Sequence, residues 1–188
     1  MKTDQSQALR HRVRRLTLLF IVGLMLSGAT AIPLESEVSW LVRVTGAERI
    51  TAASADVEAA AWEIWLVKAG DALVKTRRRH PFLFYGTDWL AFGHFVIAIA
   101  FIGALREPAR NVWLFDFGLI ACALVIPYAL IFGAMRGIPL WWRLIDCSFG
   151  VFRAIPLWFC RRWALELAPV EEPSPRFDAA QTRHSQAT

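Results

Sequence analysis

The chain has 188 residues, of which 56% are hydrophobic, and its formal net charge at pH 7 is +5. Ordinary soluble domains contain about 45–50% apolar residues, so the excess, which comes in blocks, excludes that class and predicts an integral membrane protein. The basic residues lie mostly at the ends of the hydrophobic blocks, which is typical of membrane topology signals rather than of nucleic-acid binding.

Residues 1–15 form a basic segment. It carries one lysine and four arginines against a single aspartate, and the positive-inside rule therefore predicts a cytoplasmic N-terminus. Residues 16–34 follow as the first hydrophobic segment, about as long as one bilayer crossing of ~20 residues. Ala29-Thr30-Ala31 also fits a signal-peptidase site, so the segment is either a retained anchor or a cleaved signal peptide. The anchor is favoured, because further hydrophobic segments follow.

Residues 35–87 are predicted to be extracytoplasmic and to contain a helix. Ser54 is placed to cap that helix, and Pro81 is placed to stop it. Its apolar side chains recur at helical spacing on one face: Trp62, Trp65, Leu66, Ala69 and Leu73. Such an amphipathic helix either lies on the membrane surface or covers the bundle as a lid, and apolar packing favours the lid. The run Arg77-Arg78-Arg79 at its end would suit lipid phosphates, although a solvated helix end is the favoured interpretation.

Three more hydrophobic segments are predicted to cross the membrane, at residues 88–105, 112–135 and 139–160. The first of them should begin as a capped helix after Gly86-Thr87. Pro127 and Pro156 predict kinks in the other two. Ala129 and Gly133 form a small-xxx-small pair, which is suited to close helix contact.

Tryptophans mark the ends of these segments, where indole rings settle between headgroups and tails. They are Trp89, Trp113, Trp141, Trp142, Trp158 and Trp163. The predicted fold is all-α, an integral membrane four-helix bundle over residues 16–163, with the amphipathic extracytoplasmic helix between the first two spans. Residues 164–188 should form a disordered cytoplasmic tail. The arginine- and alanine-rich composition is typical of a GC-rich bacterial genome, so a bacterial inner membrane is the expected location.

Ionisable residues inside the predicted spans are the candidate functional residues, because charge within a bilayer is costly and usually functional. They are Asp88, His94, Asp116, Arg143, Asp146 and Arg153. Three of them, Arg143, Asp146 and Arg153, share one stripe of the last span, and this stripe should face the bundle. Depth along the spans predicts two clusters: an outer one of Asp88, His94, Arg143 and Asp146, and an inner one of Asp116, Arg153 and Arg110.

Three interpretations of these residues remain open at this point. The favoured one is structural: paired charges fix helix register, and His94 is a hydrogen-bond partner. The second is an ion or proton path, because a histidine lies beside a carboxylate. The third is a haem or metal site, and it is the weakest because His94 has no histidine partner within the spans. No cofactor is therefore predicted.

Other chemistry finds little support in the sequence. No GxSxG, HExxH or P-loop motif occurs in a suitable context, so an enzyme is not favoured. The cysteines Cys122, Cys147 and Cys160 lie in separate places without a CxxC pair, so neither a disulfide framework nor a zinc site is predicted.

Three stretches resemble those of a small uncharacterised family of bacterial multi-pass membrane proteins. They are GTDWLAFGH (Gly86 to His94), REPARNVWLFDFG (Arg106 to Gly118) and GIPLWWRLIDCSFG (Gly137 to Gly150). The resemblance covers the last three predicted spans. It implies a multi-pass inner-membrane protein and carries over no activity and no site residue.

The chain is accordingly predicted to be a structural or accessory component of a membrane assembly. Its surroundings would be the lipid bilayer, and its partner would be a membrane protein or further copies of the chain itself; nucleic acid is not expected. The alternative is a small oligomeric transporter or channel that uses His94, Asp146, Asp116 and Arg153 as an ion or proton path.

Overall fold

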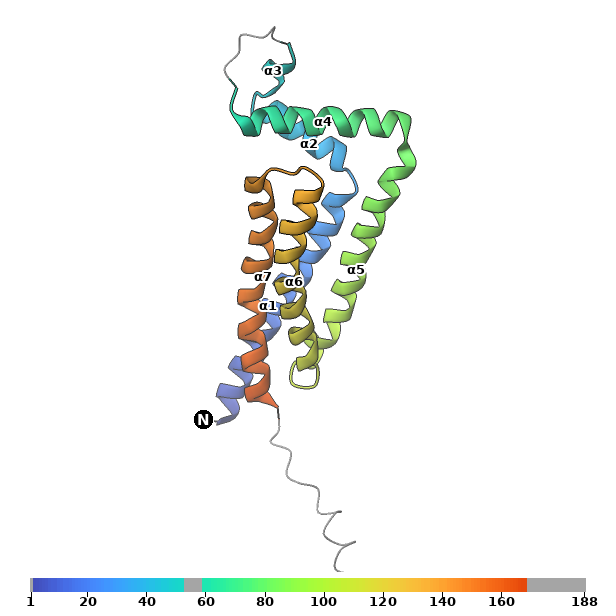
Figure 1. The fold of residues 1–188 in the computed structure, drawn as a ribbon. Coiled ribbons are helices and arrows are strands. Elements are labelled where there is room, and N and C mark those ends of the chain that lie inside the picture. The colour runs from blue at the N-terminus through green and yellow to red at the C-terminus, as the bar shows by residue number, and fades with distance from the viewer. Residues whose placement is uncertain (1, 53–58, 169–188) are drawn as a thin grey trace, which may run out of the picture. The chain divides into compact units, whose positions relative to one another are not determined.

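The structure, a computed structural model, describes residues 2–52 and 59–168, and every element within those ranges is helical (Figure 1). The chain divides into two compact units. The N-terminal unit is Arg15–Arg106, and the C-terminal unit joins residues 1–14 to the chain from Glu107 onward.

The N-terminal unit contains most of the elements. Helix α1, Lys2–Ala31, starts in the other unit and continues into this one without a break. It is followed by α2 (Leu34–Val44), α3 (Glu48–Ala52), α4 (Ala61–Arg79), the 3-10 helix η1 (Pro81–Phe84) and α5 (Tyr85–Arg106).

Helices α2 and α4 lie side by side and antiparallel (Figure 1). Arg77 in the last turn of α4 forms an ion pair with Glu35 in the first turn of α2, at 2.6 Å. Gly70 faces α2: a Cβ at this position would make ordinary contacts, 3.5 Å from Val38 and 3.6 Å from Val42. Helix α2 was not predicted, although its apolar residues recur at helical spacing.

The predicted extracytoplasmic helix differs in part from α4. Its predicted cap, Ser54, lies outside the described residues, and α4 itself begins at Ala61. The helix ends at Arg79, just before Pro81, as predicted. Of the predicted apolar face, Leu66 is buried, whereas Trp62 is 42% exposed, so the face turned toward α2 is narrower than the sequence pattern indicated.

The predicted cap after Gly86-Thr87 is wrong. Helix α5 already begins at Tyr85, directly after η1, whose first residue is Pro81. Proline favours the first position of a helix, because its fixed φ suits that position and its missing N–H is not needed there. The hydroxyl of Thr87 donates a hydrogen bond to the carbonyl of Phe84 at 2.7 Å instead of accepting one as a cap.

The C-terminal unit contains a helical hairpin of α6 (Val112–Met135) and α7 (Leu140–Leu167) (Figure 1). The bounds of α6 coincide with the predicted third span. The turn is closed by two backbone hydrogen bonds, from Ile138 N–H to the Gly133 carbonyl at 2.9 Å and from Gly137 N–H to the Ala134 carbonyl at 3.0 Å. This is the Schellman pattern, and it needs the left-handed backbone that Gly137 adopts with φ +70°.

Three stretches of the described residues are long and apolar enough to cross a membrane: Gln5–Ala31, Pro81–Arg106 and Val112–Met135. They make the chain a membrane protein in a lipid bilayer. Helix α7 has 28 residues but is not among the three, because Arg143, Asp146 and Arg153 interrupt its apolar run.

Candidate functional site

The end of the hairpin next to its turn is built around Arg143 of α7. Its Nη1 donates a hydrogen bond to the backbone carbonyl of Leu130 on α6, at 3.0 Å. Its aliphatic stem lies over Gly133, where a Cβ would be 2.7 Å from the Cγ of Arg143. Gly133, predicted as half of a small-xxx-small pair, therefore makes room for an arginine side chain. The Nε of Arg143 is buried and has no partner among the described residues.

In the middle of the hairpin, α7 touches the backbone of α6. A Cβ on Gly150 would lie 2.7 Å from the carbonyl oxygen of Cys122, so a larger residue at position 150 would push the helices apart. Nearby, the thiol of Cys147 donates to the carbonyl of Ile126 at 3.8 Å. Beside these contacts, α6 and α7 form an apolar groove of about 530 Å³ whose lining contains no charged side chain.

At the far end of the hairpin, Asp116 near the start of α6 forms an ion pair with Arg161 near the end of α7. The sequence predicted an inner cluster of Asp116 with Arg153 and Arg110, whereas the structure pairs Asp116 with Arg161, eight residues after Arg153. Arg110, the other predicted partner, lies 3.7 Å from Glu107 in its own turn. Cys160, next to Arg161, donates through its thiol to the carbonyl of Val13 in α1, at 3.7 Å.

The other two predicted residues of the α7 stripe, Asp146 and Arg153, make fewer identified polar contacts than Arg143. Asp146 and Arg153 are both half-buried. Within the part of the C-terminal unit that the structure describes, no hydrogen bond or ion pair involves Asp146. The stripe that contacts α6 runs through Arg143, Cys147 and Gly150, so Asp146 lies at its margin.

Asp88 and His94 lie on α5, in the N-terminal unit, whereas Arg143 and Asp146 lie in the C-terminal unit. The predicted outer cluster therefore remains a prediction. Within its own unit, His94 contacts the carbonyl of Leu90 in the preceding turn through Nδ1, at 2.8 Å. Its Cβ also lies where α1 crosses α5, because a Cβ on Gly28 of α1 would be 3.1 Å from it. Both contacts agree with a packing role for His94.

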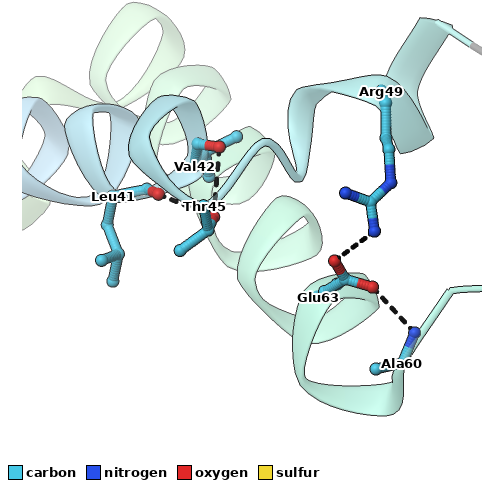
Figure 2. Close-up of polar contacts among 6 residues, drawn as sticks. All are labelled: Leu41, Val42, Thr45, Arg49, Ala60 and Glu63. Carbon is cyan, nitrogen blue, oxygen red and sulfur yellow. Dashed lines mark hydrogen bonds and ion pairs between the residues drawn. The ribbon is translucent and has the colours of Figure 1, made fainter.

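A polar network outside the predicted spans was missed by the sequence reasoning. Glu63 of α4 is only 5% exposed, and Figure 2 shows its carboxylate between two donors. It accepts a hydrogen bond from the backbone N–H of Ala60 at 2.9 Å and one from the guanidinium of Arg49 at 2.5 Å. The first bond caps α4, and the second ties α3 to it. The same view shows Thr45 donating to carbonyls at the end of α2.

These contacts define what the site can do. Within the described residues, no three histidine, cysteine, aspartate or glutamate side chains are close enough to hold a metal ion. The polar groups of Arg143, Asp116 and Cys147 are each directed to the opposite helix of the hairpin. Together with the close contact at Gly150, these groups connect α7 to α6 along the hairpin.

Comparison with known proteins identifies no family for this chain. No protein-family model, curated protein or solved structure matches the chain. The resemblance of three stretches to a bacterial membrane family is therefore not supported by a matching family model.

Proposed function

We propose that this membrane protein crosses the bilayer four times and serves as a structural or accessory component of a membrane assembly. α7 would be the fourth span. Its 28 residues amount to about 42 Å of helix at ~1.5 Å per residue, which is enough to cross the hydrocarbon core. Two of its arginines, Arg143 and Arg161, bond to α6, which lowers the cost of placing them in a membrane.

One observation carries the structural role: within the described part of the hairpin, the polar contacts of Arg143 and of Asp116 tie α7 to α6 at opposite ends and share no residue. A proton or ion path needs polar groups that follow one another across the membrane. In the hairpin, the apolar groove beside Gly150 lies between the polar contacts at Arg143 and Asp116. An apolar stretch between two separate polar contacts supports a role in holding the helices together rather than in conducting ions.

The extracytoplasmic helices would supply the contact with a partner. Trp40 of α2 is 61% exposed, and Trp62 of α4 is exposed as well. Exposed aromatic side chains on a water-facing module are enriched at protein interfaces. In this proposal the protein resides in a bacterial inner membrane with both termini in the cytoplasm, and a membrane protein or a second copy of the chain meets α2 and α4.

Purification from the native membrane with a mild detergent tests this role. The full chain should retain a membrane-protein partner or a second copy, and Trp40→Ser should release it while the elution profile of the chain stays monodisperse. Lys68→Ser, at an exposed position of the adjacent helix α4, is the control and should retain the partner. Monomeric wild-type protein without any companion would contradict the proposal.

A second candidate, a proton or ion path, is favoured by one observation: Asp146 is half-buried and unpaired in the described residues. Proteoliposomes containing a pH-sensitive dye test it. A path predicts proton flux that is lost in Asp146→Asn and His94→Ala while the thermal stability of both variants is kept. The structural role predicts no flux above that of empty liposomes.

A further inference from the structure

The start of α5 carries an acidic notch among exposed aromatic rings. Tyr85, Asp88, Trp89 and Phe92 follow the i, i+3, i+4, i+7 spacing of one helix face and line a notch of about 230 Å³. The rings are ordered by edge-to-face contacts, with centroids 5.9 Å apart for Tyr85 and Trp89 and 5.4 Å apart for Trp89 and Phe92. Tyr85 and Trp89 are 62% and 55% exposed.

The chemistry of this notch suits a cation. A carboxylate attracts positive charge, and the faces of tryptophan, tyrosine and phenylalanine rings attract cations as well. Asp88 has no hydrogen-bond or ion-pair partner among the residues the structure describes, and its side chain is exposed. Its carboxylate is therefore available to a ligand from outside the chain.

The position of the notch indicates where the ligand comes from. The membrane-capable stretch that includes α5 begins at Pro81, so Asp88 lies in the first turns of a span, at the level of the lipid headgroups. Tyrosine and tryptophan settle at this level because one end of each ring system is polar and the other apolar. A ligand at this depth is a headgroup of the surrounding bilayer.

The neighbouring arginines narrow the choice of headgroup. Arg77, Arg78 and Arg79 end α4 immediately before η1, and all three are exposed. Arg77 pairs with Glu35, whereas the described residues offer no ion-pair partner to Arg78 or Arg79. Exposed arginine side chains that precede the span in this way attract phosphate. A zwitterionic headgroup, with an ammonium next to a phosphate, satisfies both charges.

We propose that the Asp88 notch binds the ammonium of a phosphatidylethanolamine headgroup whose phosphate is attracted by Arg78 and Arg79. A primary ammonium donates hydrogen bonds to a carboxylate, and charge-assisted bonds of this kind are strong. A trimethylated ammonium has no N–H to donate, so phosphatidylcholine binds less tightly. Lipid specificity goes beyond the proposed structural role, and it rests only on the insertion of α5 into the bilayer.

Native mass spectrometry of the full chain, titrated in detergent with defined lipids, tests the proposal. Dioleoylphosphatidylethanolamine should bind with an apparent Kd about five- to tenfold lower than its N-acetylated form, in which a neutral amide replaces the ammonium; this is the range expected for one charge-assisted contact. Equal affinity of the wild-type protein for the two lipids overturns the proposal, whatever any variant does.

Variants assign the effect to residues. Asp88→Asn should abolish the preference for the ethanolamine lipid over its N-acetylated form. The double variant Arg78→Gln, Arg79→Gln should bind both of these lipids and dioleoylphosphatidylglycerol more weakly, because each lipid contains a phosphate. Asp71→Asn, on the exposed surface of α4, is the control and should leave all affinities unchanged. If Asp88→Asn still prefers the ethanolamine lipid over its N-acetylated form, the assignment to Asp88 is overturned. The same variant should still retain its membrane-protein partner or second copy on purification. The lipid result can therefore fail without the proposed assembly role failing.

Discussion

Gly150 and Gly133 occupy different environments although both face the opposite helix of the hairpin. At Gly150 the nearest atom to an added Cβ is the Cys122 carbonyl oxygen, at 2.7 Å, and a backbone atom cannot swing away. At Gly133 the nearest atoms belong to the side chain of Arg143, which has several rotatable bonds. The two glycines should therefore differ in their tolerance of substitution.

Gly150→Ala should lower the free energy of unfolding by about 1–3 kcal/mol, the usual cost of overpacking. Gly133→Ala should cost less, because Arg143 can shift. Thermal unfolding in detergent, followed by fluorescence-detected size exclusion, gives the order of the variants. Gly93→Ala is the control, since nothing lies within 4 Å of a Cβ at that position; a Gly150→Ala midpoint at or above that of Gly93→Ala would refute the close contact.

The partner of Asp116 illustrates what sequence can predict at this scale. Span depth suggested that the guanidinium of Arg153 would reach Asp116, whereas the structure pairs Asp116 with Arg161. Depth is known only to within a turn or two, however, and arginines occur at several levels of α7. Which of them meets Asp116 depends on the register of the hairpin, and that register is set by the close contact at Gly150, which hydropathy does not report.

At the scale of elements, Glu63 holds two helices together. Its carboxylate joins the start of α4 to Arg49 of α3, and it is buried although the pair lies outside the predicted spans. Helix α3 has only five residues, too few to be stable alone. Its order thus depends on this contact and on its packing against α4.

Glu63→Ala should increase hydrogen exchange of the backbone amides in α3 and in the first turn of α4 by about tenfold, equivalent to ~1.4 kcal/mol of lost local stability. Glu63→Gln should have a smaller effect, because its amide oxygen still accepts the bond from Ala60. Exchange measured by mass spectrometry distinguishes the variants. Asp71→Asn, in an exposed pair with Lys75, should show no change, and identical exchange in all three variants would contradict the network.

The ion pair at the far end of the hairpin should contribute less than its geometry implies. Both side chains are about two-fifths exposed, at 42% for Asp116 and 41% for Arg161. In the proposed topology they lie toward one membrane surface, where water screens their attraction. A double-mutant cycle of Asp116→Asn and Arg161→Gln should give a coupling energy of about 0.5–1 kcal/mol. A double-mutant cycle of Arg162 and Glu166, an exposed pair within α7, is the comparison. Zero coupling energy between Asp116 and Arg161 would show that this ion pair does not stabilise the hairpin.

Some elements followed from sequence and others did not. The bounds of α6 were predictable because a lipid-facing helix needs an unbroken apolar run with polar ends. Helix α2 was not predicted because only its first residue, Leu34, belongs to the preceding apolar run and Glu35 and Glu37 then break it, although Leu34, Val38, Leu41 and Val42 recur at helical spacing. Its packing against α4 is a tertiary contact that this local spacing does not identify.

At the scale of the whole molecule, the membrane assignment was the most predictable feature, because it depends on composition and block length alone. The topology proposed for the chain can be tested with single cysteines. Lys68→Cys on α4 should react with a membrane-impermeant maleimide in intact cells. Glu107→Cys, in the turn before α6, should react only after the cells are permeabilised.

The native cysteines make this measurement clean. Cys122, Cys147 and Cys160 are all buried, so unmodified protein should give little background labelling. The predicted crossing by α5 requires opposite outcomes at the two sites. Labelling of both cysteines from the same side would show that α5 does not separate the α4 region from the α5–α6 turn.

The ionic side chains of α7 bear on the order of events during biogenesis. In the proposed topology α7 leaves the ribosome after α6, and a charge costs ~2.5–3.5 kcal/mol at the centre of an isolated inserting helix. Helix α6 is already available at that moment, with the Leu130 carbonyl and the Asp116 carboxylate to receive Arg143 and Arg161. In that topology α7 would enter lipid beside α6, and a ribosome stalled before residue 167 would leave α6 in the membrane without its partner helix.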